Sequence, residues 1–203
     1  MVDKSVYSCQ TLKPDVLTMS VKREELTHTA LQLFYDNGIN AIGINEILTR
    51  SGIAKKTLYS HFKSKEALLL AALQLRHEKF ISWLEENLRE ATSDTDAVNR
   101  LFGALVRWFN DEEAALGHFK GCFFINTSAE FSNDDSPVYQ FCSQHKKRVK
   151  EVVGRYLRAN TDTLDIVCLL MEGAIVTAFV SGETEKPSKL ALTLLSSMLN
   201  ENK

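Results

Sequence analysis

The sequence predicts an all-α protein, and three observations lead to that prediction. Apolar residues recur at spacings of three and four along most of the chain, which is the period of an α-helix. The 203 residues include only 9 glycines and 3 prolines, so long interruptions between helices are few. No segment shows a strong strand-like alternation, although GCFFIN at 121–126 is ambiguous by itself. A content of 44% hydrophobic and 25% charged residues is that of an ordinary globular protein with a sizeable core.

The N-terminal part predicts a leader followed by a helix. Residues 1–19 are expected to form a flexible leader, and Met19 is an alternative start to Met1. A helix is predicted over 21–35, and an Asn-Gly pair ends it because glycine readily adopts the left-handed conformation. The apolar stripe of this helix consists of Leu26, Ala30, Leu33 and Phe34.

Three further helices are predicted in the next stretch, over 44–51, 55–61 and 64–88. Gly52 separates the first two, and Ser64 caps the long third one. The remaining predicted helices cover about 95–110, 121–131, 137–159, 163–181 and 187–201. Their boundaries are predicted at Asp94, Ser136-Pro137, Asp162 and Pro187.

The helices at 44–51 and 55–61, joined by a glycine-containing turn, are typical of a helix-turn-helix. Leu58 and Phe62 anchor one face of the short second helix, so its polar side chains are free to enter a DNA major groove. Its first turn carries Lys55 and Lys56, where cations oppose the helix dipole, and residue 54 offers no capping side chain. Bare N–H groups beside two lysines suit a bound phosphate, so the segment predicts DNA binding.

The stretch NGINAIGINEILTRSGIAKKTLYSHFKSKEALLLAAL, residues 37–73, closely resembles the DNA-binding domain of TetR-type transcriptional regulators. The resemblance covers about residues 20–75. It implies a helix-turn-helix domain over 20–66 and a helical effector-binding and dimerisation domain over 67–203. The matching positions are Gly38, Ile44, Glu46, Ile47, Gly52, Ile53, Lys55, Thr57, Leu58, Tyr59, Phe62, Ser64, Lys65 and Glu66.

The resemblance also implies which residues contact DNA. Thr57, Tyr59 and Lys65 would contact the phosphate backbone, and Lys55, Lys56 and His61 lie where backbone or base contacts are made. The alternatives are that Tyr59 only packs and that Lys63 or Lys65 is a solvated charge. Departures from the family pattern leave the operator sequence open, and Gly43 in particular replaces a usual hydroxyl residue that contacts phosphate. The other departures are Leu48, Ala54, Lys56 and His61.

Candidate effector contacts lie in the C-terminal part. The segment GCFFINTSAEF, 121–131, resembles one found in a large branch of the family. Cys122, Asn126 and Glu130 are four apart, so they share one face of a helix and predict a polar stripe in a small-molecule pocket. The alternative is that Asn126 and Glu130 bond to backbone or to an arginine. Further candidates, with core packing as the alternative, are Trp108, Tyr139 and Glu172.

The last two predicted helices are unusually apolar for terminal elements, and their small residues permit close helix approach. They predict a homodimer in which two helices from each subunit form a four-helix interface. A monomeric core is the alternative. The small residues are Gly173, Ala174, Ala178 and Ser181.

Other classes of protein find little support. No apolar run approaches the ~18 residues that cross a bilayer, and no signal peptide is visible, so a cytoplasmic protein without membrane contact is predicted. An S-x-x-K match at 60–63 lacks the partner motifs of an enzyme, and no cofactor is expected. No C-x-x-C pair indicates a disulfide framework or a metal site. The four cysteines are Cys9, Cys122, Cys142 and Cys168.

The sequence therefore predicts a ligand-responsive regulator, most simply a repressor. It would bind a palindromic operator in double-stranded DNA as a homodimer and be released by a small-molecule effector. Two alternatives stay open. One is an electrophile- or redox-sensing repressor acting through Cys122, because a thiol near a helix N-terminus can be reactive. The other is an architectural DNA-binding protein without a specific operator.

Overall fold

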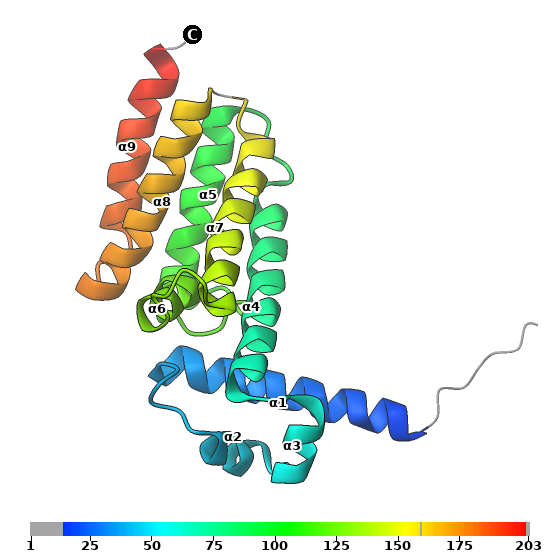
Figure 1. The fold of residues 1–203 in the computed structure, drawn as a ribbon. Coiled ribbons are helices and arrows are strands. Elements are labelled where there is room, and N and C mark those ends of the chain that lie inside the picture. The colour runs from blue at the N-terminus through cyan, green and yellow to red at the C-terminus, as the bar shows by residue number, and fades with distance from the viewer. Residues whose placement is uncertain (1–13, 159, 202–203) are drawn as a thin grey trace, which may run out of the picture.

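The computed structural model describes residues 14–158 and 160–201, and all regular elements in this part of the chain are helices. Figure 1 shows a small group of helices at one end of an elongated helical bundle. The helices are α1 (Pro14–Asn37), α2 (Ile44–Ser51), α3 (Lys55–His61), α4 (Lys65–Leu88), α5 (Asp94–Phe109), α6 (Phe123–Glu130), α7 (Pro137–Tyr156), α8 (Thr161–Ser181) and α9 (Lys186–Glu201).

The helix α1 begins at Pro14, earlier than the predicted 21–35. Residues 14–19, expected in a flexible leader, are therefore helical, while the rest of that leader lies outside the described residues. A proline suits the first turn of a helix because its missing N–H is not needed there. No glycine or further proline interrupts the chain between Pro14 and Asn37, which lets the helix extend.

Side-chain caps mark four helix starts: those at Ser64 and Ser136 confirm the predicted boundaries, while those of α5 and α8 come one or two residues before the predicted 95 and 163. The Ser64 hydroxyl accepts a hydrogen bond from the Ala67 N–H, and Ser93 does the same for Asp96. Ser136 and Asn160 cap α7 and α8 in the same manner. These bonds satisfy backbone donors that the first helical turn leaves free.

The N-terminal helices form a compact group against the start of α4. The helix α1 packs on α4, and α2 and α3 pack beneath α1 (Figure 1). The core of this group consists of Leu26, Ala30, Phe34, Ile39, Ile47, Leu58, Phe62 and Leu69, none of them more than 3% exposed. Burial of these side chains holds the two short helices, which would be marginal alone.

The C-terminal helices form the bundle. The helix α4 packs on α7 and α5, while α9 packs on α5 and α8. The short α6 lies at the end of the bundle that faces α1 (Figure 1). The ambiguous stretch at 121–126 enters this helix, because Phe123 and Phe124, each 2% exposed, insert into the core.

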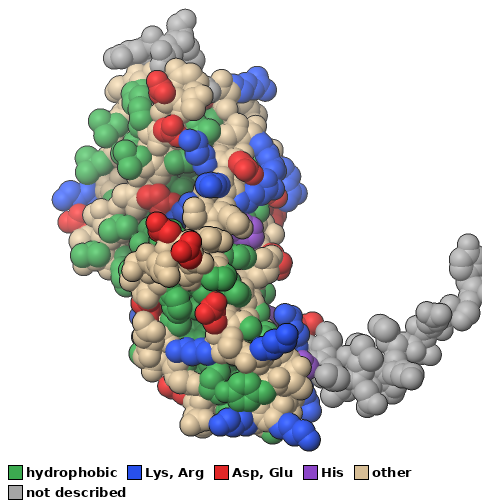
Figure 2. Space-filling model, in the orientation of Figure 1, with side chains coloured by type: hydrophobic (Ala, Val, Ile, Leu, Met, Phe, Trp, Pro, Cys, Tyr) green, Lys and Arg blue, Asp and Glu red, His purple; other side chains and the backbone are tan. Residues whose placement is uncertain are grey.

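The helix α8 is long and apolar enough, by length and composition, to cross a membrane, with a mean hydropathy of 1.9 over 18 residues. In the fold it is one member of the bundle, packed against α5, α7 and α9. A third of that window is buried inside the chain. The outward side of α8 and α9 retains exposed apolar side chains, and Figure 2 shows green side chains on this flank. They include Leu169, Val176, Phe179, Val180, Leu190 and Leu194.

Candidate functional site

The turn between α2 and α3 sets the position of the short third helix. Gly52 adopts a left-handed φ of 67°, and its N–H donates to the Leu48 carbonyl at 2.9 Å. This closes α2 in the manner that favours glycine. Leu58 is fully buried and Phe62 is 3% exposed, and the Arg23 guanidinium lies 5.1 Å from the Phe62 ring centre. The inward face of α3 is thereby fixed.

The outward face of α3 carries the cations that the sequence singled out. Lys55, Lys56 and Tyr59 are exposed, with Tyr59 at 46%, and Thr57 is half-buried. Ala54 precedes the helix in an extended conformation without a side-chain cap. Figure 2 shows Lys and Arg side chains gathered at this end of the molecule. The face combines positive charge with uncapped N–H groups, an arrangement suited to phosphate.

Two other predicted DNA contacts are turned inward. The Lys65 ammonium donates to the Ile39 carbonyl at 2.5 Å and lies 5.7 Å from the Phe34 ring centre. His61 is half-buried, and its Nε2 is enclosed with no hydrogen-bond partner among the described residues. In this conformation neither head group faces solvent as Lys55 does. Their contact with DNA stays a prediction.

The predicted stripe of Cys122, Asn126 and Glu130 makes separate contacts within the described part of the chain, and its role in effector binding stays a prediction. Cys122 is the residue before the first turn of α6, and the Asn126 amide donates to the Lys120 carbonyl at 3.2 Å. The Glu130 carboxylate accepts from the backbone N–H groups of Ile39 and Asn40 at 2.8 and 2.7 Å. The backbone alternative is thus the observed one. The reason is that α6 is only eight residues long and its end meets backbone donors of the α1–α2 turn.

Glu130 therefore joins the bundle to the helix-turn-helix. The α1–α2 turn presents its N–H groups because Gly38 adopts a φ of +85°, a conformation that L side chains rarely take. A Cβ at Gly38 would also lie 3.4 Å from Glu130 Oε1. The turn leads directly into α2, so Glu130 contacts the segment that precedes the helix-turn-helix.

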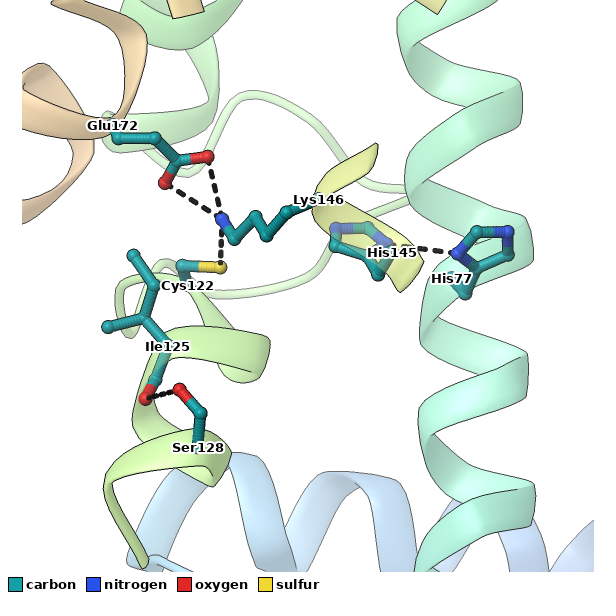
Figure 3. A network of polar contacts seen from close by, with 7 residues as sticks. All are labelled: His77, Cys122, Ile125, Ser128, His145, Lys146 and Glu172. Carbon is teal, nitrogen blue, oxygen red and sulfur yellow. Dashed lines mark hydrogen bonds and ion pairs between the residues drawn. The ribbon is translucent and has the colours of Figure 1, made fainter. Parts of the chain in front are cut away.

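A half-buried cation on α7 gathers two of the predicted effector residues. The Lys146 ammonium lies 3.2 Å from Cys122 Sγ and 2.7 and 2.8 Å from the two Glu172 oxygens (Figure 3). Burial lowers the pKa of Lys146, but Cys122 and Glu172 outweigh burial and the pKa is raised overall. Sequence reasoning missed Lys146 because it stands in the basic run KKR at 146–148, which has the pattern of a solvated surface.

A small cavity of about 250 Å³ opens beside Lys146 between α6 and α7. Tyr139, one of the predicted effector contacts, lines it, and the other lining residues are Phe124, Ile125, Ser128, Cys142, Ser143 and Lys146. Burial raises the pKa of Cys142 to about 12, so this thiol stays protonated near neutral pH. Apolar walls around one cation suit a small polar or electrophilic molecule.

A histidine pair lies behind this cavity. His145 Nδ1 and His77 Nδ1 are 3.0 Å apart (Figure 3). The His145 ring also stacks on Phe124, with ring centres 3.4 Å apart. Only one of the two nitrogens can donate, so at least one ring is neutral. Burial, Lys146, His77 and Arg76 together lower the pKa of His145 to about 2. The pair is therefore a neutral structural contact at ordinary pH.

Trp108, another predicted effector contact, belongs to the core. It is 1% exposed and packs edge-on against Phe80 and Phe119, with Trp83 beside it. Its indole N–H has no hydrogen-bond partner among the described residues. Its burial favours the core-packing alternative, and contact of Trp108 with an effector stays an untested prediction.

The short helices α2 and α3, with the exposed cationic face of α3, are typical of a helix-turn-helix regulator, and comparisons with known proteins agree. Residues 26–72 match the family described as bacterial regulatory proteins, tetR family. The transcriptional activator FasR of Mycolicibacterium smegmatis is 37% identical over 89 residues, which are 44% of this chain and 39% of FasR. The transcriptional repressor KstR2 of the same organism is 34% identical over 135 residues, 64% of this chain and 60% of KstR2.

The fold has a counterpart among solved structures. SCO4454, a TetR-family transcriptional regulator from Streptomyces coelicolor, superposes with a TM-score of 0.77 at 22% identity, over 90% of this chain and 96% of that one. Residues 26–72 therefore form a DNA-binding domain of the TetR family of bacterial regulatory proteins, which is not a family of enzymes, and the chain as a whole shares the fold of SCO4454. Its matches span less than two thirds of the length of the two curated relatives.

Proposed function

We propose that this protein binds a specific operator in double-stranded DNA through α3 and represses transcription there. The observation that supports it most is the exposed face formed by Lys55, Lys56 and Tyr59 within the family-matched segment. Phosphate contacts from such a face fix the register of a helix in the major groove, where its polar side chains read base edges. Of the two relatives, KstR2 is named a transcriptional repressor and FasR a transcriptional activator.

The operator-binding form is a homodimer built through α8 and α9. Leu169, Val180, Leu190 and Leu194 are each more than half exposed, and an apolar face of this extent is typical of a surface covered by a partner. A second copy of the chain supplies the same face, which gives a two-fold four-helix interface. Two copies of α3 then address two half-sites in successive major grooves, so the operator is palindromic.

The effector site lies beside Lys146, at the cavity between α6 and α7. An effector bound there contacts α6, and Glu130 links the end of α6 to the α1–α2 turn. A bound effector favours a conformation in which the two recognition helices no longer match the half-site spacing, and operator DNA is released. This population shift requires that the effector bind the released state more tightly than the DNA-bound state.

A redox- or electrophile-sensing mode through Cys122 is a second candidate. The Lys146 ammonium donates to Cys122 Sγ at 3.2 Å, and a neighbouring lysine is a common feature of reactive cysteine sites. The same thiol is 8% exposed, and the Glu172 carboxylate competes for Lys146. Loss of operator release in a Cys122→Ser variant treated with N-ethylmaleimide would favour this mode, and unchanged release would exclude it.

The same proposal includes the domain boundaries, the cellular location and a specific operator, in place of the architectural alternative. The helix-turn-helix domain covers 20–66, the effector and dimerisation domain covers 67–203, and the protein acts in the cytoplasm.

Fluorescence anisotropy tests the operator directly, with DNA that flanks the protein's own gene against a scrambled duplex. Preference for the flanking DNA supports a specific regulator. Equal, strongly salt-dependent binding to both duplexes and to a genome-wide selected pool would favour the architectural alternative.

A further inference from the structure

Arg76 on α4 is a buried cation without a counter-charge. It is 4% exposed, and no carboxylate among the described residues forms an ion pair with it. Its guanidinium donates to the Leu116 carbonyl at 2.5 Å and to the Tyr35 hydroxyl at 3.3 Å. The Tyr35 and Trp108 rings lie 4.5 and 5.7 Å from its central carbon. These partners are neutral, and a buried charge is costly unless an opposite charge accompanies it.

A cavity of about 380 Å³ opens beside this guanidinium, where α1, α4 and the loop after α5 meet. Its charged lining is net positive, because Arg76 and the half-buried Lys79 face one exposed carboxylate, Asp36. Burial lowers the pKa of Lys79, and the Arg76 charge lowers it further. Other lining residues include His28, Leu31, Gln32 and Leu116.

We propose that this cavity binds a small organic carboxylate whose two oxygens pair with the Arg76 guanidinium. A planar guanidinium matches the planar carboxylate in a two-bond arrangement that a lone hydroxyl or carbonyl does not offer. Lys79 adds attraction at the rim, and Leu31 and Leu116 supply an apolar wall for the carbon chain. The volume falls within the range of small-molecule sites. This site is separate from the cavity beside Lys146.

Occupancy of the cavity would reach the helix-turn-helix through Tyr35. The Tyr35 hydroxyl donates to the Gly121 carbonyl at 2.8 Å and accepts from the Lys120 N–H at 3.0 Å, just before α6. A carboxylate that draws Arg76 away from Tyr35 therefore alters the contact between α1 and the segment that leads into α6. This regulatory consequence rests on the proposed function, whereas binding of the carboxylate does not.

Ligand-observed NMR titration of the full chain, without DNA, tests the site. The probes are sodium hexanoate, its uncharged analogue hexanamide, and inorganic phosphate. Hexanoate is expected to bind at least tenfold more tightly than hexanamide and more tightly than phosphate. Equal affinity for hexanoate and hexanamide would overturn the proposal, and tighter binding of phosphate would overturn the assignment to carboxylates.

Three variants locate the binding. Arg76→Met keeps the bulk of the side chain and should lower hexanoate affinity at least tenfold. Lys79→Met leaves the core intact and should lower it about threefold, which keeps the test valid if Arg76→Met fails to fold. Arg89→Met removes an arginine whose side chain is 68% exposed and should change nothing. Unchanged hexanoate binding in a folded Arg76→Met protein, or in Lys79→Met, would overturn the site even if operator binding is intact.

Discussion

Replacement of Glu130 tests the link between the bundle and the helix-turn-helix. Its carboxylate accepts two backbone hydrogen bonds, from Ile39 at 2.8 Å and from Asn40 at 2.7 Å. A hydrogen bond to a charged group contributes about 1.5–3 kcal/mol when buried. Because Glu130 is half-buried and Asn40 is exposed, solvent screening reduces each to about 1 kcal/mol. Glu130→Ala should then cost about 2 kcal/mol, since the buried Ile39 N–H loses its partner.

Glu130→Gln separates the charge from the geometry. The amide oxygen retains one acceptor, so about half of the loss, ~1 kcal/mol, is expected. For a chain of this size a loss of 1 kcal/mol lowers Tm by about 2–4 °C, which gives roughly 4–8 °C for Glu130→Ala. Glu90→Ala is the matched control, because Glu90 is exposed and makes no side-chain hydrogen bond among the described residues.

Urea denaturation and operator titration would be measured on the same preparations. We expect the Glu130→Ala protein to be less stable and also to show a weaker response of operator affinity to effector. If Glu130→Ala is as stable as Glu90→Ala and keeps the full effector response, the proposed link is wrong. The two hydrogen bonds to the α1–α2 turn would then neither stabilise the fold nor couple effector binding to operator binding.

Three single positions or pairs allow further tests. Gly43, the residue before α2, has an extended backbone, and a Cβ added there would meet open space. Gly43→Ser should therefore add a helix cap and raise the free energy of unfolding, measured by urea denaturation, by a few tenths of a kcal/mol. It should also tighten operator binding, measured by anisotropy, if the new hydroxyl contacts a phosphate. Val180 and Leu194 are 77% and 56% exposed, so Val180→Glu/Leu194→Glu should shift sedimentation from dimer to monomer, and an unchanged mass would contradict the interface. The folded-state pKa of His145, about 2, lies below the unfolded value near 6.5, so the unfolded chain binds more protons in between and stability is lost as pH falls below 6.5. This loss is about 1.4 kcal/mol at pH 5.5, and His145→Gln should show a flatter pH dependence of its urea midpoint than wild type.

The helices were predictable because local patterns fix them. Gly52 marks the turn between α2 and α3, and Ser64 caps α4 at the predicted position. The early start of α1 at Pro14 was not predicted, because the apolar stripe that identified this helix begins only at Leu26. The end of α7 at Tyr156 comes before the predicted 159, since a helix end also depends on tertiary contacts that the local pattern does not contain.

The candidate site was less predictable because its contacts join residues far apart in the chain. Helical spacing placed Cys122, Asn126 and Glu130 on one face, but each finds a different partner outside α6. The sequence did not predict the burial of Lys146 and Arg76, because a lysine in a basic run and an arginine in an amphipathic helix have the pattern of surface residues. Their burial results from the packing of α4, α6 and α7, which periodicity alone does not describe.

Operator reading by the exposed face of α3 is the core of the proposed function. It can be tested by the anisotropy of labelled flanking DNA titrated with wild type and with Lys55→Ala/Lys56→Ala/Tyr59→Ala, with Lys147→Ala/Lys189→Ala as the control for lost positive charge. We expect the α3 variant to lose its preference for flanking over scrambled DNA, and its salt dependence to fall by about one unit of slope per lysine removed. The control should keep the preference. An α3 variant that still prefers the flanking DNA as strongly as wild type would show that α3 does not read the operator.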